Sequence, residues 1–388
     1  MTSTLAHTPQ PPSRLPQVGT TIFTVMSALA AEHGAVNLGQ GFPDFDGDPR
    51  LIDAVAQAMR EGLNQYPPMV GVPHLRDAIS AKLAALYGRR YDPATEITVT
   101  AGATQGILTA VLSVVGPGDE VIVLEPCYDS YVPNIQLAGG TPVRVALKAG
   151  TFRPDFDAIS AAITPRTRAI ITNSPHNPSA TIWRAADLQA LADLLRGTEI
   201  VLISDEVYEH MVYDGEAHAS VCAHEALAAR AFVISSFGKT YHVTGWKIGH
   251  VVAPASLMAE FRKVHQFNVF TVNTPMQHGL ARYMSDPVPY RSLPAFYQRK
   301  RDLFRNGLAG TRFRLLPSEG SYFQCVDYSA ISSLPEVDFC RWLTTEIGVA
   351  AIPLSAFYED QRNQGLARFC FAKKDETLTS ALDRLARL

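Results

Sequence analysis

The strongest constraint on the fold of this chain is a series of short apolar runs rich in β-branched residues. Most of these runs are continuously apolar and do not alternate with polar residues, so both faces of each strand must be covered. Helical patterns lie between several of them, as in units that alternate strands and helices. The runs therefore predict an α/β fold with a mainly parallel seven-stranded sheet and helices on both faces. They lie at residues 97–100, 120–124, 141–146, 169–172, 200–204, 231–235 and 249–252.

The regions on either side of these strands have a different pattern. Apolar residues recur at helical spacing at 20–31, 49–61, 73–87 and 107–115, and again from residue 275 to 305. Short strands at 322–326 and 366–371 then alternate with helices at 337–346 and 376–388, which predicts a smaller α+β domain. The predicted organisation is a flexible N-terminal arm (1–18), an N-terminal part of the small domain (19–47), a large domain (48–290) and a small C-terminal domain (291–388).

Composition narrows the functional class. The 34 basic and 37 acidic residues give a net charge of −3, which offers no electrostatic footprint for nucleic acid or an anionic membrane. The N-terminus has no apolar signal region, and no apolar window is long enough for a membrane span, so we expect a cytoplasmic protein. The five cysteines are scattered and lack metal-binding spacing, which favours reduced thiols in the core and no metal site.

One lysine occupies a position typical of ligand chemistry. Lys239 follows the strand at 231–235, and open α/β sheets bind ligands beyond the carboxyl ends of their strands. An amine that is desolvated or placed near other cations loses its proton and becomes a nucleophile toward aldehydes. The alternative for an isolated lysine is an ordinary solvated loop charge.

Other strand ends carry further polar residues. The turn Gly102-Ala103-Thr104 opens a helix, so its amides and the helix dipole suit a phosphate, although small residues at such turns also serve packing. Asp205 ends an apolar strand, where an unpaired carboxylate is costly, and this predicts a cationic partner.

Together these groups match the needs of pyridoxal phosphate. That cofactor requires an amine for its aldehyde (Lys239), a carboxylate for its ring nitrogen (Asp205), donors to its ring oxygen (Asn177 and Tyr208) and an aromatic ring to stack upon (Tyr128). Each residue has a structural alternative when taken alone, and Asn177 also fits a plain Asn-Pro turn. The set as a whole predicts pyridoxal 5'-phosphate.

On these motifs the chain resembles the class I/II aminotransferases, a family of pyridoxal-phosphate transferases of fold type I. The resemblance extends from Asn37 to Arg368, and it is closest to the branch of bacterial methionine aminotransferases and kynurenine aminotransferases (glutamine transaminase K). The matching motifs are FPDFD at 42–46, SPHNP at 174–178, DEVYEH at 205–210, FGKT at 237–240 and TGWK at 244–247.

The resemblance assigns a role to each candidate site residue. It makes Lys239, Asp205 and Tyr208 catalytic, and it makes Arg368 and Gly41 contacts of the substrate carboxylate, with Asn177 beside them. It adds Tyr128, Asn177, Gly102, Ala103, Thr104, Ser236 and Lys247 as cofactor contacts, Tyr66 as a phosphate contact in the neighbouring subunit, and Phe23 and Phe270 as apolar pocket residues. A core role is open for the two phenylalanines. Apolar neighbours predict that Arg368 is buried, and the Tyr66 assignment implies a homodimer with shared active sites.

Two positions depart from the wider family. Gly238 stands where many aminotransferases have serine, and Lys247 stands where many have arginine. The phosphate site therefore loses a hydroxyl and exchanges a bidentate fork for a point charge. The methionine and kynurenine branch shares this pattern, so we interpret it as a property of the branch.

The predicted reaction is ping-pong transamination between an L-amino acid and a 2-oxo acid, with Lys239 moving the proton. No second cationic group for a side-chain carboxylate is evident, so we expect methionine and aromatic or large apolar amino acids as donors. The alternatives are a kynurenine aminotransferase or cysteine-S-conjugate β-lyase on the same cofactor, and a non-catalytic regulator that binds the cofactor. The regulator is disfavoured because no basic DNA-binding module precedes Thr20.

Overall fold

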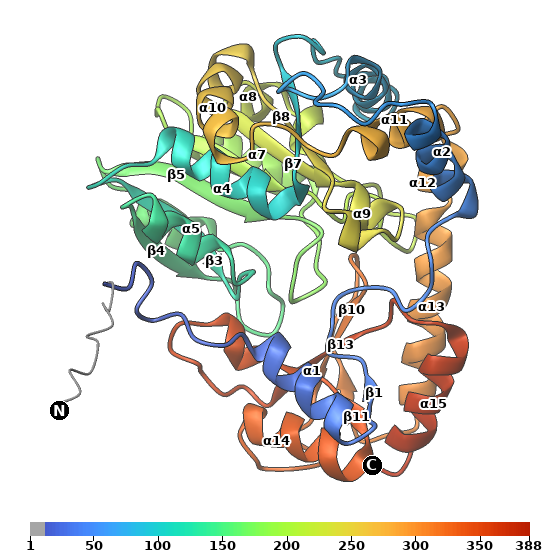
Figure 1. Cartoon of the computed structure of the whole chain (residues 1–388). Helices are drawn as coiled ribbons and strands as arrows, with labels where there is room; N and C mark the ends of the chain where they lie inside the picture. The colour runs from blue at the N-terminus through green and yellow to red at the C-terminus, as the bar shows by residue number, and fades with distance from the viewer. Residues whose placement is uncertain (1–11) are drawn as a thin grey trace, which may run out of the picture.

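The computed structural model describes residues 12–388 and has a large seven-stranded sheet in the upper part of the molecule as drawn in Figure 1. The strand order is β2-β8-β7-β6-β5-β3-β4; β8 is antiparallel to both neighbours, and the other pairings are parallel. The predicted fold class is therefore confirmed. The bounds are β2 Ile97–Thr100, β3 Glu120–Glu125, β4 Thr141–Ala146, β5 Thr167–Asn173, β6 Val201–Asp205, β7 Ala231–Ser236 and β8 Gly249–Val252.

The apolar runs are continuous because helices cover both faces of this sheet. In β3, Val121 and Val123 belong to one buried cluster, and Ile122 and Leu124 belong to the other. The first cluster is closed by α4, α5 and α10, and the second includes residues of α3, α6, α7, α8 and α11. The bounds are α3 Pro73–Tyr87, α4 Gly102–Val114, α5 Tyr131–Leu137, α6 Phe156–Ala162, α7 Ala185–Leu194, α8 Glu225–Ala228, α10 Ala255–Asn268 and α11 Thr274–Tyr283.

A smaller antiparallel sheet of order β12-β13-β10-β9 forms the lower part of the molecule in Figure 1. The two ends of the chain meet there, because β1 pairs with β11 and α1 packs beside them. The long helix α13 leads down to this part and lies against α15. The bounds are α1 Ile22–Glu32, β1 Val36–Asn37, α13 Leu293–Leu308, β9 Arg314–Leu315, β10 Phe323–Asp327, α14 Glu336–Trp342, β11 Val349–Ala350, β12 Ile352–Pro353, β13 Leu366–Cys370 and α15 Asp375–Leu385.

Short elements complete the described chain. They are α2 Pro49–Arg60, α9 Phe237–Thr240, α12 Val288–Arg291, the 3-10 turns η1 Val221–Ala223, η2 Thr244–Trp246 and η4 Leu354–Phe357, and the π-helical turn η3 Leu343–Ile347. The division predicted from the sequence falls between β1 and α2 and, at its second boundary, inside α12, just before the last residue of that helix, Arg291. Of the predicted N-terminal arm, positions 1–11 lie outside the described residues.

The turn Gly102-Ala103-Thr104 was predicted to open a helix, and α4 does begin at Gly102, ahead of the apolar run that starts at Ile107. The first turn has small and polar residues, which carry no helical periodicity, and Gly102 has a φ of +77° that favours glycine. The cysteines are free and buried as predicted. Within residues 12–388, no helix has the length and apolar character needed to cross a membrane.

Candidate active site

A cavity of about 310 Å³ opens where the carboxyl ends of the large sheet's strands approach the small sheet. All but two of the residues predicted for the site line this cavity. Those lining it are Phe23, Gly41, Gly102, Ala103, Thr104, Tyr128, Asn177, Asp205, Tyr208, Ser236, Lys239, Lys247 and Arg368. Residues 41 and 368 come from the two ends of the chain, so the cavity depends on the packing of those ends against the large sheet.

Lys239 lies in α9, the short helix that directly follows β7. Its amine donates hydrogen bonds to the Gly41 carbonyl at 3.0 Å and to the Tyr322 hydroxyl at 2.7 Å. Burial disfavours the charged form and lowers the pKa of Lys239 to about 8, and the nearby charges of Lys247 and Arg368 act in the same direction. About a tenth of this amine is therefore unprotonated at pH 7, far more than for an ordinary lysine, and the unprotonated form is the one that nucleophilic and proton-transfer chemistry requires.

Asp205 ends β6 and is buried. Its carboxylate accepts hydrogen bonds from the Tyr131 hydroxyl at 2.6 Å and from the Val207 amide at 3.3 Å. Burial raises the pKa of Asp205 to about 6 in the protein alone. Both donors are neutral, so the carboxylate can still pair with a cation in the cavity. Tyr131 was not predicted, because this contact joins residues 74 positions apart and no local motif marks it.

The N-terminus of α4 faces the cavity without a side-chain cap. A Cβ at Gly102 would lie 3.3 Å from both Cε and Nζ of Lys247, which places that ammonium against the first turn of the helix. Ser236 lines the cavity beside them. Free amides, the positive end of the helix dipole, an ammonium and a hydroxyl together form a site suited to a phosphate group.

Arg368 lies in β13 and is 1% exposed, so its predicted burial is confirmed. It donates to Asn177 Oδ1 at 2.5 Å and to the Gly39 carbonyl at 3.1 Å, whereas its Nε has no partner in the described structure. The centroid of the Phe323 ring lies 4.0 Å from the guanidinium carbon. No carboxylate of residues 12–388 forms a salt bridge with this guanidinium. A buried guanidinium without an anion fits a carboxylate ligand.

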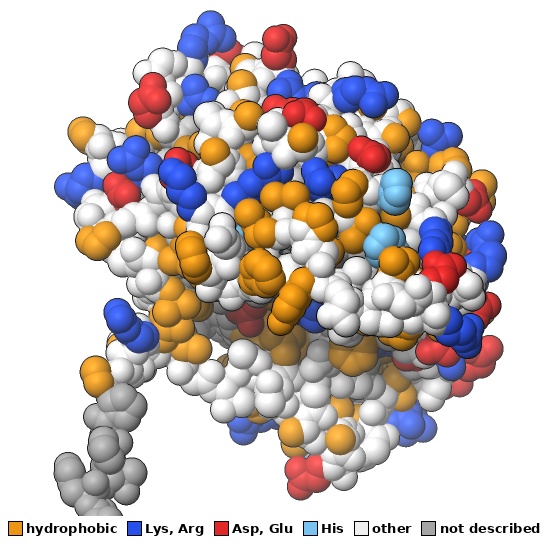
Figure 2. Space-filling model, turned by 45° about the horizontal axis from the view of Figure 1, so that its top comes forward, with side chains coloured by type: hydrophobic (Ala, Val, Ile, Leu, Met, Phe, Trp, Pro, Cys, Tyr) orange, Lys and Arg blue, Asp and Glu red, His pale blue; other side chains and the backbone are white. Residues whose placement is uncertain are grey.

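The two predicted residues that do not line this cavity are Tyr66 and Phe270. Their rings pack edge to face with centroids 5.4 Å apart. The Tyr66 side chain is 82% exposed and Phe270 is 44% exposed, while Phe267 nearby in sequence is 86% exposed. Figure 2 shows hydrophobic side chains gathered on the upper half of the molecule, above a hollow that separates it from the lower half.

Comparison with known proteins shows the family. The model for "Aminotransferase class I and II" matches residues 33–385. A methionine aminotransferase of Escherichia coli is 54% identical over 97% of this chain and 98% of its own length. A solved Escherichia coli structure, described as identifying a methionine aminotransferase function, is 53% identical with a TM-score of 0.97, covering 98% of this chain and 100% of that one.

More distant relatives have other activities. A probable N-succinyldiaminopimelate aminotransferase of Mycobacterium tuberculosis is 42% identical, and a kynurenine–oxoglutarate transaminase of Dictyostelium discoideum is 34% identical. They cover 97% and 99% of this chain, and the match spans 98% of each relative. The chain belongs to the class I and II aminotransferase family. It is an aminotransferase, and its cofactor is pyridoxal 5'-phosphate.

The cavity residues fit this cofactor. The α4 N-terminus with Lys247 suits its phosphate, and the buried Asp205 suits its ring nitrogen. Tyr128 supplies an aromatic face, and the Lys239 amine supplies a nucleophile for its aldehyde. The predicted cofactor is therefore confirmed by membership of the aminotransferase family, and the side chains of the cavity suit each of its chemical groups.

Proposed function

We propose that this enzyme transfers the amino group of L-methionine and of aromatic or large apolar L-amino acids to a 2-oxo acid by a ping-pong mechanism. The observation that carries the proposal is the set of side chains around Arg368. This guanidinium has no protein carboxylate, and Phe23, Phe323 and Phe357 have ring centroids within 5.3 Å of its central carbon. A substrate carboxylate bound there has aromatic surfaces beside it, which favours an apolar side chain.

A carboxylate in the cavity strengthens this choice of donor. Asp129 lines the cavity next to Tyr128, and burial raises the pKa of Asp129 while the charge of Arg368 lowers it. A second carboxylate on the substrate would meet this acid. Among the described residues that line the cavity no further cation is free, because Lys239 and Lys247 are assigned to the cofactor and Arg368 to the first carboxylate. The 54% identity to a methionine aminotransferase supports the same substrate class.

We assign the cofactor contacts as follows. Lys239 would bind the aldehyde, Asp205 would hold the ring nitrogen in its protonated form with Tyr131 behind it, and Asn177 and Tyr208 would donate to the ring oxygen. Tyr128 would lie against the ring, and Gly102, Ala103, Thr104, Ser236 and Lys247 would hold the phosphate. When bound, the cofactor withdraws electrons from the substrate Cα, which makes the Cα proton removable.

The protein then supplies orientation and proton transfer. Arg368 binds the substrate carboxylate with Asn177 and the Gly41 backbone beside it, which fixes the position of Cα. The Lys239 amine, with its pKa lowered to about 8, would take the Cα proton as general base and, holding it at Nζ, would then be the general acid of the reaction.

We further propose a homodimer in the cytoplasm. Tyr66, Phe267 and Phe270 are exposed aromatic residues, and such groups are enriched at interfaces. In this arrangement Tyr66 and Phe270 complete the site of the partner subunit. Five free, buried cysteines suit a reducing compartment. Light scattering of the purified protein should give twice the mass of one chain.

The central test replaces Lys239 by alanine. The variant should lose transamination of methionine, because both the aldehyde-binding amine and the proton carrier are removed. Lys263→Ala is the matched control, because Lys263 is largely exposed and forms only a salt bridge with Glu260 on its own helix. Normal turnover by the Lys239→Ala enzyme would show that the assignment is wrong. Half-reaction rates of the unaltered enzyme with methionine, phenylalanine, kynurenine, glutamine and aspartate then test the proposed donors.

The second candidate is a kynurenine aminotransferase or cysteine-conjugate β-lyase. The 34% identity to a kynurenine–oxoglutarate transaminase favours it, and the aromatic surroundings of Arg368 accept a kynurenine ring. Pyruvate and ammonia formed from a cysteine S-conjugate without an added 2-oxo acid would demonstrate the lyase reaction. Faster reaction with kynurenine than with methionine would favour the aminotransferase alternative.

A further inference from the structure

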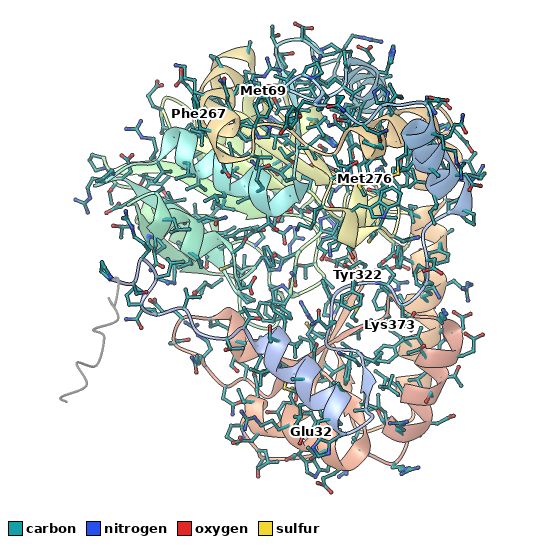
Figure 3. The ribbon with its side chains drawn as sticks, viewed as in Figure 1. Glu32, Met69, Phe267, Met276, Tyr322 and Lys373 are labelled. Atoms are coloured by element: carbon teal, nitrogen blue, oxygen red, sulfur yellow. The ribbon has the colours of Figure 1, made fainter. Side chains whose placement is uncertain are left out.

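Tyr322 makes a contact with the reactive lysine that no sequence motif indicated. It precedes β10, its side chain is fully buried, and it lies between the large sheet and the lower part of the molecule (Figure 3). Its hydroxyl accepts a hydrogen bond from Lys239 Nζ at 2.7 Å and donates one to the Gly41 carbonyl. That same carbonyl accepts from Nζ at 3.0 Å. One amine, one hydroxyl and one carbonyl from three distant segments therefore form a closed triangle.

The position of this triangle is fixed by close packing. A Cβ at Gly41 would lie 3.1 Å from Phe323 Cζ and 3.7 Å from Tyr322 Cε2, so the absence of a side chain lets this backbone approach. The Tyr322 ring packs edge to face on Tyr208, with centroids 5.0 Å apart. Gly41 and Tyr322 belong to segments around the small sheet, whereas Lys239 lies in α9, directly after a strand of the large sheet. The amine is thus held where the two parts meet.

The hydrogen bonds of this arrangement leave the Lys239 amine able to accept a proton. An unprotonated amine has two N–H groups and one lone pair. The Gly41 carbonyl and the Tyr322 hydroxyl accept one N–H each, so the lone pair is left without a protein donor. Burial raises the pKa of Tyr322 well above its ordinary value of 10, so the phenol stays neutral. Its O–H group donates a hydrogen bond to the Gly41 carbonyl.

We propose that Tyr322 is a positioning residue of the transamination, whose hydroxyl holds the released Lys239 amine together with the Gly41 carbonyl and directs its lone pair to the substrate Cα. This proposal rests on the proposed role of Lys239. Tyr322 neither gains nor loses a proton in it. Its contribution is orientation, since a freely rotating lysine amine would reach the productive position only part of the time.

The test compares two tyrosines that each lose only a hydroxyl. Tyr322→Phe removes the acceptor. Tyr297→Phe is the control, because Tyr297 is also fully buried, its ring centroid lies 5.9 Å from that of Tyr322, and its hydroxyl has no hydrogen-bond partner in the described structure. Both substitutions keep the aromatic ring, so any change in packing that follows from removing a buried hydroxyl should be similar in the two variants.

The first readout is the half-reaction of the loaded enzyme with L-methionine and with α-deuterated L-methionine, followed by stopped-flow absorbance of the cofactor. Tyr322→Phe should slow it by about tenfold or more, with a larger deuterium isotope effect and a KM within about twofold of the parent. Tyr297→Phe should match the parent. Equal rates and isotope effects for the two variants would overturn the proposal.

The second readout needs no cofactor. In the apoenzyme, the pH dependence of Lys239 acylation by acetic anhydride is measured by peptide mass spectrometry. Loss of a hydrogen-bond acceptor disfavours the charged amine, so Tyr322→Phe should shift the midpoint to lower pH by about half a unit or more. The charged and titratable neighbours Asp205, Tyr208, Lys247, Arg368 and Cys370 are the same in both variants. An unshifted midpoint would contradict the contact, whereas inactivity of the parent enzyme would refute only the proposed function.

Discussion

A buried salt bridge behind the active site gives the most quantitative prediction for this enzyme. Lys82 of α3 and Glu209 lie 2.7 Å apart, and their side chains are 4% and 3% exposed. Glu209 also accepts from the hydroxyl groups of Tyr87 and Ser235. Glu209 follows Tyr208, and Ser235 precedes Ser236, so the pair supports two segments that reach the cavity. Lys82→Met removes the cation and leaves a buried carboxylate with two hydroxyl donors.

The expected loss is large because the remaining charge stays buried. Removing one partner of a buried pair costs about 3–5 kcal/mol. An unfolding entropy of about 2.1 cal/mol/K per residue gives roughly 0.8 kcal/mol/K for a chain of this length, so the melting temperature should fall by about 4–6 °C. Differential scanning calorimetry at pH 7 measures this directly. Lys263→Met is the matched control, because the Lys263–Glu260 distance is also 2.7 Å but the side chains are 69% and 51% exposed. Its effect should stay within about 0.5 kcal/mol.

The same pair predicts a sign for the pH dependence. Although burial opposes ionisation, the charge of Lys82 and the hydrogen bonds from Lys82 and Ser235 hold the pKa of Glu209 well below its ordinary value of 4.5. In the parent, the stabilisation is present above that ordinary value and is lost as the pH falls through the pKa of the folded protein. In Lys82→Met, burial dominates and raises the pKa, so the carboxyl is protonated at a higher pH. The loss of stability of Lys82→Met relative to the parent should therefore become smaller as the pH falls from 7 to 5. The double variant Lys82→Met/Glu209→Gln should recover part of that loss. Equal melting temperatures for Lys82→Met and the Lys263→Met control would refute this reasoning.

Two further predictions concern the cavity. Because the pKa of Asp205 is raised to about 6 in the protein alone, cofactor uptake by the apoenzyme should weaken as the pH falls through 6 and the carboxyl becomes protonated. A fluorescence titration of the apoenzyme with the cofactor should show this pH-dependent change in affinity. The Asp205→Asn apoenzyme should bind the cofactor weakly at every pH, without the change near pH 6. If the change persisted in this variant, another group would be responsible for it. Arg368→Lys should lower kcat/KM for methionine by about 10- to 100-fold, the equivalent of 1.5–3 kcal/mol for a charged hydrogen bond, while cofactor absorbance is unchanged. An unchanged kcat/KM would remove Arg368 from substrate binding.

The sequence predicted those parts of the fold and cavity that depend on local pattern. Strands covered on both faces must be apolar at every position, so β3 and β5 could be found from composition alone. Parallel strands bring their carboxyl ends to one edge of the sheet, which is why the sequence was enough to place Asp205 and Lys239 together. The small residues of the turn at Gly102 were enough to predict the start of α4. The close approach of the Lys247 side chain to Gly102 joins distant segments, so it could not be predicted from that turn.

The residues that could not be predicted share one physical property: each acts through another side chain. Tyr131 is 74 positions from Asp205, Tyr322 is 83 positions from Lys239, and Lys82 is 127 positions from Glu209. A tyrosine or lysine in an amphipathic stretch satisfies the local pattern whether or not its polar end has a distant partner, so only the packed structure reveals the contact. These supporting groups nevertheless determine the chemistry. Asp205 has a neutral hydroxyl donor and remains available for a cation, and the Lys239 amine has two acceptors and keeps a free lone pair. A chain that retained every family motif but lost Tyr322 would therefore keep its cofactor and lose rate.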